Sequence, residues 1–233
     1  MSSPSTRPLK HNLLLLRKET TMKKVILLGA TSNISRYLIP LLLQSRDIEL
    51  RLFARQATRR LVAYAQNPQV TLIDGNWNNE HDLLSAIAGT DIVYLATGHF
   101  AEANQRIVRV MTQAHVHRII IAGGLGIYDE VAGKFGAWNA RMMGDYTEIK
   151  RAASVFDQSE LDYTFLRMAW LYNNDEHLDY KIIPKGEAFV DTQVTRQAVA
   201  RLIREIILKP TLYKKTSIGV AEPNTAWGKP SFY

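Results

Sequence analysis

Short apolar segments that alternate with helical segments are the feature of this sequence that most restricts its fold. From Val25 onward each short segment is apolar at nearly every position, which indicates strands buried on both faces of a sheet. The predicted strands are VILLGA (25–30), IELRLFAR (48–55), QVTLIDG (69–75), DIVYLATG (91–98) and RIIIAGG (118–124). The segments between them have the one-sided apolar spacing of helices, which is typical of parallel strands joined by right-handed crossovers. The sequence therefore predicts a doubly wound α/β sheet.

The first predicted helix, NISRYLIPLLLQS (33–45), contains a proline. Pro40 has no backbone N–H to donate to the preceding turn, so we expect a kink or a divided helix at this position. A later helical segment is regular, with apolar residues at i, i+4, i+7, i+8 and i+11 from Ala103 to Ala114.

Composition narrows the class of protein. The 233 residues suit one domain with a sizeable core, and the absence of cysteine excludes disulfides, thiolate metal sites and a thiol nucleophile. This composition fits a reducing cytoplasm, where we expect the protein to be located. The apolar runs are far shorter than the roughly 20 residues of a membrane helix, so no membrane partner is expected.

The net charge of +7 is concentrated near the N-terminus. Residues 1–24 hold six Lys or Arg residues against Glu19, a net of +5, which leaves +2 for the rest of the chain. A nucleic-acid-binding domain usually has a basic face on its fold, so we expect no nucleic-acid partner. Residues 1–21 are rich in serine and proline, and we predict that they form a flexible extension before a single domain spanning 22–233.

The turn after the first strand, GATSNIS (29–35), has the pattern G-x-x-S-x-x-S. A doubly wound sheet places phosphates at this turn, and a side chain at its first position would block their approach to the backbone. Serines stand where further glycines are usual, but the free N–H groups and positive end of the following helix still suit an anion. We therefore predict a dinucleotide site, with a flavodoxin-like or other α/β domain as the alternative. The predicted contacts are Gly29, Thr31, Ser32, Asn33 and Ile34, with a side-chain donor from Ser32 or Asn33.

Residues that follow the other strands suit the rest of such a cofactor. Arg55, with Arg59 and Arg60 close behind, stands where a 2′-phosphate would lie, which favours NADP(H) over NAD(H); solvated surface arginines are the alternative. After the third strand, Gly75 precedes Asn76, whose amide suits an adenine edge or equally a turn. Small residues that end the next two strands are predicted to leave room for the cofactor: Ala96, Thr97, Gly98, Ala122 and Gly123.

From about Lys24 to the C-terminus the chain resembles the atypical, NmrA-like branch of the short-chain dehydrogenase/reductase superfamily. The matching motifs are GATSNIS, FAR after the second strand, GN after the third, ATG after the fourth, YTEIKRAASVFDQSELDYTFLRMAWL (146–171), VTRQAVARLIREIILKP (194–210) and SIGVAEPNTAWGKPSF (217–232). Met168 stands where the superfamily usually has proline after an arginine, here Arg167. The resemblance implies a Rossmann sheet of order 3-2-1-4-5-6, a cofactor contact at Met168, and a small C-terminal substrate lobe built mainly from 168–233.

Tyr146 and Lys150 form the pattern Y-x-x-x-K, which places both on one helix face. Both residue types are common here, so the inference rests on their position just before the sixth strand. The resemblance implies that Lys150 lowers the pKa of the Tyr146 phenol and holds the nicotinamide ribose. Tyr146 would then transfer a proton while hydride passes between nicotinamide and a carbonyl or alcohol carbon. The expected function is an NADP(H)-dependent oxidoreductase acting on a small carbonyl or quinone-like substrate.

One catalytic residue of the superfamily is missing. Its members usually have a serine or threonine at the end of the fifth strand, but this chain has no serine between Arg118 and Tyr146. Either Tyr128, a backbone N–H or a water supplies the lost hydrogen bond, or the protein binds NADP(H) without turnover as a redox-responsive regulator.

Two segments, 125–145 and 168–180, are predicted to roof a substrate pocket. Their large side chains would form an apolar mouth for a flat carbonyl compound, or would instead pack the small lobe: Tyr128, Trp138, Met142, Met143, Trp170 and Tyr172. His115 and His117 flank a helix end without a third ligand, so no metal site is predicted. The substrate is not readable from the sequence, and we expect a monomer or a weak homodimer.

Overall fold

The computed structural model describes residues 22–233, so the predicted flexible extension, 1–21, lies outside the described residues. The central sheet has eight strands in the order β3-β2-β1-β4-β5-β6-β10-β8, and every pairing in it is parallel except that of β8 with β10. The strands are β1 (Lys23–Leu28), β2 (Ile48–Ala54), β3 (Val70–Asp74), β4 (Ile92–Leu95), β5 (Arg118–Gly124), β6 (Asp162–Met168), β8 (Lys181–Ile183) and β10 (Thr216–Ala221). The predicted order 3-2-1-4-5-6 is therefore confirmed.

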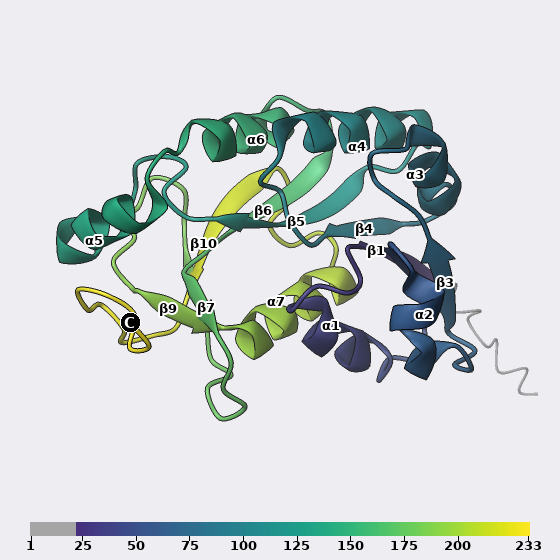
Figure 1. Cartoon of the computed structure of the whole chain (residues 1–233), viewed down its shortest axis with the longest axis horizontal. Coiled ribbons are helices and arrows are strands. Elements are labelled where there is room, and N and C mark those ends of the chain that lie inside the picture. Colours follow the sequence, from purple (N-terminus) through teal and green to yellow (C-terminus); the bar gives the residue numbers. More distant parts are fainter. Residues whose placement is uncertain (1–21) are drawn as a thin grey trace, which may run out of the picture.

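Helices cover both faces of this sheet, as Figure 1 shows. One face carries α1 (Ser35–Leu42) and α7 (Arg196–Leu208), and the other carries α3 (Glu80–Ile87), α4 (Ala101–Gln113) and α6 (Thr147–Asp157). The short helix α2 (Ala57–Arg60) and a 3₁₀ turn, Val62–Tyr64, connect β2 to β3. This layering is the doubly wound arrangement expected from the sequence.

Strand β1 shows why the strand segments are apolar throughout. Val25 and Leu27 belong to the core that contains α1 and α7, whereas Ile26 and Leu28 belong to the core on the opposite face. All four are fully buried. Since successive side chains of a strand point to opposite faces, a sheet covered on both sides needs an apolar residue at every position.

Pro40 does not divide the first helix. Helix α1 continues through it and ends at Leu42, two residues later. Pro40 lacks one backbone donor, and the residue is exposed, so its ring displaces no core side chain.

A smaller part of the molecule, which we call the C-terminal lobe, consists of α5 (Gly133–Met143), β7 (Trp170–Tyr172), β9 (Gln193–Thr195) and residues 222–233. Strands β7 and β9 pair in parallel as a separate two-stranded sheet. Figure 1 shows α5 and β9 beyond the end of the main sheet that carries β10. The lobe differs from the predicted range 168–233 because α7 and β10 belong to the main fold, and because α5 precedes that range.

Candidate active site

Gly29 shapes the turn between β1 and α1. Its φ is +89°, a left-handed conformation that side chains other than glycine rarely adopt. A Cβ at this position would lie 2.8 Å from the Cβ of Ala96, which follows β4. The absence of a side chain therefore allows the tips of β1 and β4 to approach closely and leaves the backbone of the turn open.

Ser32 and Ser35 brace this turn from within. Ser32 Oγ accepts a hydrogen bond from the Ser35 N–H (3.1 Å) and donates to Ser35 Oγ (2.9 Å). Ser35 Oγ donates in turn to the Gly29 carbonyl (3.1 Å). The sequence suggested Ser32 as a side-chain donor to phosphate, but its hydroxyl hydrogen is used inside the turn.

Three backbone N–H groups at the start of α1 remain available. Those of Thr31, Asn33 and Ile34 donate no hydrogen bond to any of residues 22–233, whereas those of Gly29 and Ala30 both donate to a carbonyl at the end of β2. Free N–H groups at a helix N-terminus form a natural binding site for a phosphate group. The turn therefore fits a dinucleotide pyrophosphate, despite having a single glycine.

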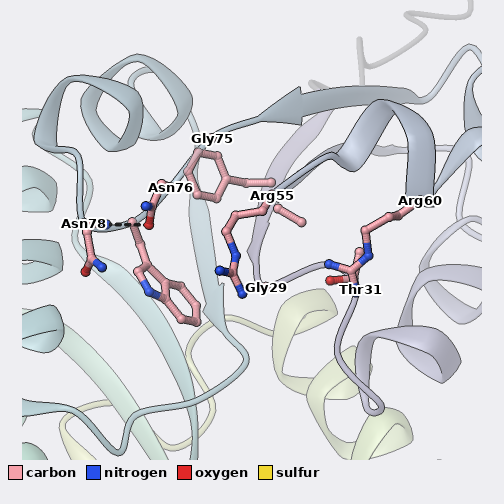
Figure 2. A pocket seen from close by; sticks show the side chains of 10 residues that line it. Gly29, Thr31, Arg55, Arg60, Gly75, Asn76 and Asn78 are labelled. Atoms are coloured by element: carbon pink, nitrogen blue, oxygen red, sulfur yellow. Dashed lines mark hydrogen bonds between the residues drawn. The ribbon is translucent and has the colours of Figure 1, made fainter.

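A cleft of about 240 Å³ lies beside the turn (Figure 2). Its walls come from the carboxyl ends of three neighbouring strands, β1, β2 and β3, which is where ligands bind in open α/β sheets. The residues that line it are Gly29, Thr31, Phe53, Ala54, Arg55, Arg60, Gly75, Asn76, Trp77 and Asn78. The structure thus brings together five of the predicted cofactor contacts.

The arginines after β2 supply positive charge to this cleft. Figure 2 shows the Arg55 side chain extending toward Gly29, and that of Arg60 toward Thr31. Both side chains are exposed, and neither guanidinium has a hydrogen-bonding or ionic partner among residues 22–233. Arg59 differs, because it donates a hydrogen bond to the Gln56 side chain. Two unpaired guanidinium groups beside an anion-binding turn suit a phosphate ester.

The segment after β3 forms the opposite wall. Asn76 Oδ1 accepts a hydrogen bond from the Asn78 N–H (3.1 Å, dashed in Figure 2), so Asn76 has the turn role that the sequence left open. Its amide also lines the cleft, with both N–H donors unused among the described residues. A side chain at Gly75 would overlap the ring of Phe53, so glycine is required here by the cleft wall itself.

The small residues after β4 and β5 are explained largely by packing. A Cβ at Gly98 would overlap the side chain of Ile121, and one at Gly123 would overlap the ring of Phe165. Packing alone therefore accounts for both glycines, whereas the sequence led us to expect that they are small to admit a cofactor. Among the predicted contacts, Gly98, Ala122, Gly123 and Met168 are buried, and Ala96 and Thr97 are partly exposed.

Tyr146 stands at the start of α6, with its ring against the backbone just beyond β5. A Cβ on Gly126 would lie 3.1 Å from the Tyr146 hydroxyl oxygen. Asn139 Nδ2 donates a hydrogen bond to that oxygen (2.5 Å), and Trp170 Nε1 donates to Asn139 Oδ1 (2.7 Å). Asn139 is 1% exposed, so the phenol oxygen is held by a buried amide. No pattern in the sequence indicated this role for Asn139.

The electrostatic role expected of Lys150 is not what the structure shows. Burial, followed by the nearby carboxylates of Glu130 and Asp129, raises the pKa of Tyr146 above its ordinary value. Lys150 Nζ instead pairs with Asp129 Oδ1 at 2.7 Å. The predicted lowering of the phenol pKa is therefore wrong for this structure, because an acidic residue on the neighbouring loop takes the ammonium group.

A buried ion pair fixes that loop. Arg167 in β6 and Glu130 lie 2.9 Å apart, with side chains 0% and 3% exposed. Glu130 also accepts hydrogen bonds from the N–H groups of Gly126 (3.0 Å) and Tyr128 (2.9 Å). The loop that contacts the Tyr146 ring is thus anchored to the main sheet by a fully desolvated pair.

Most residues of the predicted aromatic mouth gather in the C-terminal lobe. The ring centroids of Trp138 and Trp170 are 5.0 Å apart, and each lies 5.1 Å from the ring of Tyr233. Tyr172 lies beside this group, with its ring stacked on Phe232. Since Trp170 donates to the amide that holds Tyr146, the aromatic cluster adjoins the phenol. Met142 and Met143 are exposed on α5.

Tyr128 does not fill the place of the missing serine. Its hydroxyl donates to the carboxylate of Asp157 (3.0 Å to Oδ2), and its ring lies under the ammonium group of Lys185 at 3.9 Å. The hydroxyl is thus held at Asp157, the last residue of α6. The oxyanion role that the sequence left open for Tyr128 therefore has no support in the structure.

His115 and His117 are both exposed, and no group of three or more metal-ligating side chains occurs within 22–233. None of the helices described has the length and apolar character required to cross a membrane.

Comparisons with known proteins agree with this geometry. A family described as NAD(P)H-binding matches residues 29–210. Among solved structures, a short-chain dehydrogenase/reductase from Veillonella parvula is 31% identical over 91% of this chain and 100% of its own, with a TM-score of 0.85. The same enzyme in complex with NADP matches with the same identity and TM-score over 90% of this chain and 99% of its own. A Rossmann-fold NAD(P)-binding family protein from Shigella flexneri is 32% identical over 91% of this chain and 100% of its own, with a TM-score of 0.74.

The chain therefore belongs to this NAD(P)H-binding family of Rossmann proteins, and the superfamily predicted from its motifs is confirmed. A search of curated proteins finds no match.

Proposed function

We propose that the protein is an NADPH-dependent reductase that transfers hydride to a carbonyl or quinone carbon while Tyr146 donates the proton. The observation that carries this proposal is the Tyr146 hydroxyl, which is held by a buried amide and kept protonated by its raised pKa. A phenol that accepts a hydrogen bond from Asn139 keeps its own O–H free for a substrate oxygen. The same arrangement favours reduction over oxidation, since oxidation would need the phenolate as a base.

The cofactor would lie along the cleft and across the strand ends. The N–H groups of Thr31, Asn33 and Ile34 would bind its pyrophosphate, and Arg55 with Arg60 would bind a 2′-phosphate. The related Veillonella enzyme forms a complex with NADP, which supports this choice over NAD.

When bound, the cofactor supplies two electrons and a hydrogen nucleus to the substrate carbon. The Tyr146 O–H gives its proton to the substrate oxygen, so a carbonyl becomes an alcohol. Asn139 orients the phenol, and the aromatic cluster of Trp138 and Trp170 offers an apolar wall for a planar substrate. Lys150, one turn along α6 and paired with Asp129, would hold the nicotinamide ribose, as the resemblance to the superfamily implies.

A substrate panel tests this proposal. The purified protein is mixed with NADPH and with menadione, phenanthrenequinone or cinnamaldehyde, and loss of NADPH absorbance is followed. We expect turnover with at least one planar carbonyl compound, reduced roughly a hundredfold or more in Tyr146→Phe. Tyr128→Phe is the matched control and should leave the rate nearly unchanged, because Tyr128 faces Asp157. A full rate in Tyr146→Phe would exclude Tyr146 as the proton donor.

A second function is favoured by the position of the C-terminal residues. Phe232 and Tyr233 lie on the aromatic cluster and cover the wall that a substrate would use. An NmrA-like regulator that binds NADPH without turnover would have such a filled pocket. NADPH binding without oxidation by any member of the panel would favour the regulator. In either role we place the protein in the cytoplasm.

A further inference from the structure

His99 carries a buried polar atom with no assigned role. It directly follows the ATG motif at the end of β4, and its Nε2 atom is buried without a hydrogen-bond partner among residues 22–233. Burial lowers the pKa of this imidazole below its ordinary value, so the ring is neutral at neutral pH. A buried nitrogen without a partner is costly, so its presence in a folded protein requires an explanation, such as a catalytic role or a bound water.

The atom points at the position of the missing serine. Gly124 is the last residue of β5, the strand end where the superfamily usually has its serine or threonine. A Cβ built on Gly124 would lie 3.6 Å from His99 Nε2, and no other atom of the part of the chain that the structure describes, apart from its chain neighbours, would come within 4 Å. The space that a serine hydroxyl would occupy is therefore faced by an imidazole nitrogen.

His99 and Tyr146 approach the same short segment. His99 faces Gly124, while the Tyr146 ring lies against Gly126, two residues further along the chain. Residues two apart in an extended chain are separated by about 7 Å at most. Two potential hydrogen-bond donors therefore lie at the same strand end.

The backbone that carries His99 is held on both sides. The Gly98 N–H donates to the Ala122 carbonyl in β5 (2.9 Å). Asn104 Nδ2 donates both to the Gly98 carbonyl (3.0 Å) and to the Ala152 carbonyl in α6 (2.9 Å). Since Tyr146 stands at the start of α6, the buried amide of Asn104 links the backbone segments that carry the two side chains.

We propose that His99 is a catalytic residue whose Nε2–H donates a hydrogen bond to the substrate carbonyl oxygen, in place of the absent serine. This inference rests on the proposed reductase function. In the reaction the negative charge that develops on the oxygen is stabilised by the imidazole N–H, and the proton that the oxygen finally receives comes from Tyr146. His99 itself gains and loses no proton.

Exchange of the donor between two positions tests the assignment. His99→Ala should lower kcat roughly a hundred- to a thousandfold, the effect expected from removing one oxyanion donor, while the Kd for NADPH stays within about twofold of wild type. The double variant His99→Ala, Gly124→Ser restores a hydroxyl at the strand end. Serine suits this position, because Gly124 lacks a positive φ and, among residues 22–233 apart from its chain neighbours, only the imidazole that the first change removes lies close to it. We expect kcat to recover at least about tenfold over His99→Ala.

The outcomes separate the two proposals. If wild type shows no turnover with any member of the panel, the reductase function fails and the role of His99 fails with it. If wild type is active and His99→Ala has the same kcat, only the role of His99 is overturned. A double variant that binds NADPH but is no more active than His99→Ala also contradicts it.

A binding measurement on the wild-type protein tests the proposal even if a variant does not fold. Wild-type protein labelled with ¹⁵N-histidine and saturated with NADP⁺ is titrated with menadione, which cannot be reduced by the oxidised cofactor. We expect one buried Nε2 resonance to shift on binding, while those of the exposed His115 and His117 stay in place. Saturable menadione binding that leaves every histidine resonance unmoved would overturn the proposal.

Discussion

Gly29 is the single residue on which the cofactor turn depends most. Two features exclude a side chain here: the positive φ of Gly29, and the short distance that a Cβ would have to Ala96. A positive φ also occurs at glycines outside the binding turn. Gly89 offers a matched control, because its φ is +72° and a Cβ there would meet open space.

We predict that Gly29→Ala and Gly89→Ala each destabilise the protein by about 1–3 kcal/mol through backbone strain. Only Gly29→Ala should also weaken NADPH binding, by about tenfold or more, since the turn must move away from β4. Thermal unfolding and fluorescence titration measure the two effects. Unchanged NADPH affinity in folded Gly29→Ala would place the pyrophosphate elsewhere.

The two unpaired arginines of the cleft determine the choice of nucleotide. Each charge-assisted hydrogen bond to a phosphate contributes about 1.5–3 kcal/mol, so Arg60→Ala and Arg55→Ala should each weaken NADPH binding roughly tenfold or more. Binding of NADH, which lacks the 2′-phosphate, should change little. Arg59→Ala is the control, because Arg59 is turned toward Gln56. Equal losses for NADPH and NADH would contradict a 2′-phosphate site.

The raised pKa of Tyr146 predicts how kcat/KM for carbonyl reduction varies with pH. Its pKa is raised above the ordinary 10.0, so the phenol stays protonated from about pH 6 to pH 9 and is lost as a donor only at still higher pH. We predict that kcat/KM for carbonyl reduction shows no alkaline decline due to Tyr146 in this range. A decline centred near pH 8 would show that Lys150 acts on the phenol after all.

At the scale of secondary-structure elements, the pair of Arg167 in β6 and Glu130 after β5 holds the site loop to the sheet. We predict that Arg167→Met costs about 3–5 kcal/mol of unfolding free energy, because it leaves a buried carboxylate without its partner. Arg109→Met removes an arginine from the exposed pair with Glu80 and should cost under about 1 kcal/mol. Similar losses in the two variants, measured by urea unfolding, would contradict the argument.

The element order was readable from the sequence, since uniformly apolar strands and one-sided helices permit few other folds. The glycine turn and the arginines after β2 were readable for the same reason, because each stands at a strand end that the topology brings to one edge. The partners of individual side chains could not be predicted from the sequence. The bond between Asn139 and Tyr146, the pairing of Lys150 with Asp129, and the orientation of His99 all depend on loops whose course the sequence pattern does not determine.

At the scale of the whole molecule, the C-terminal residues pack against the aromatic cluster beside the site. Residues 222–233 return to the lobe so that Tyr233 contacts both Trp138 and Trp170, which are far from it in sequence. Phe232 and Tyr233 thus lie over the aromatic wall of the site.

We predict that a chain ending at Ser231 has a lower KM for menadione, because the wall is uncovered, and a red-shifted tryptophan emission. Loss of these ring pairs should also cost about 1–3 kcal/mol of stability. Trp227→Phe, at an exposed position outside the cluster, should change neither KM nor stability. An unchanged KM in the shortened chain would show that the substrate does not use this wall.

The central claim is that the edge formed by the strand ends holds NADPH for reduction. Titration of the full chain with NADPH and with NADH, followed by nicotinamide fluorescence, tests it most directly. We predict saturable binding of NADPH, with NADH weaker by about tenfold or more. Binding of neither nucleotide, or tighter binding of NADH, would contradict it.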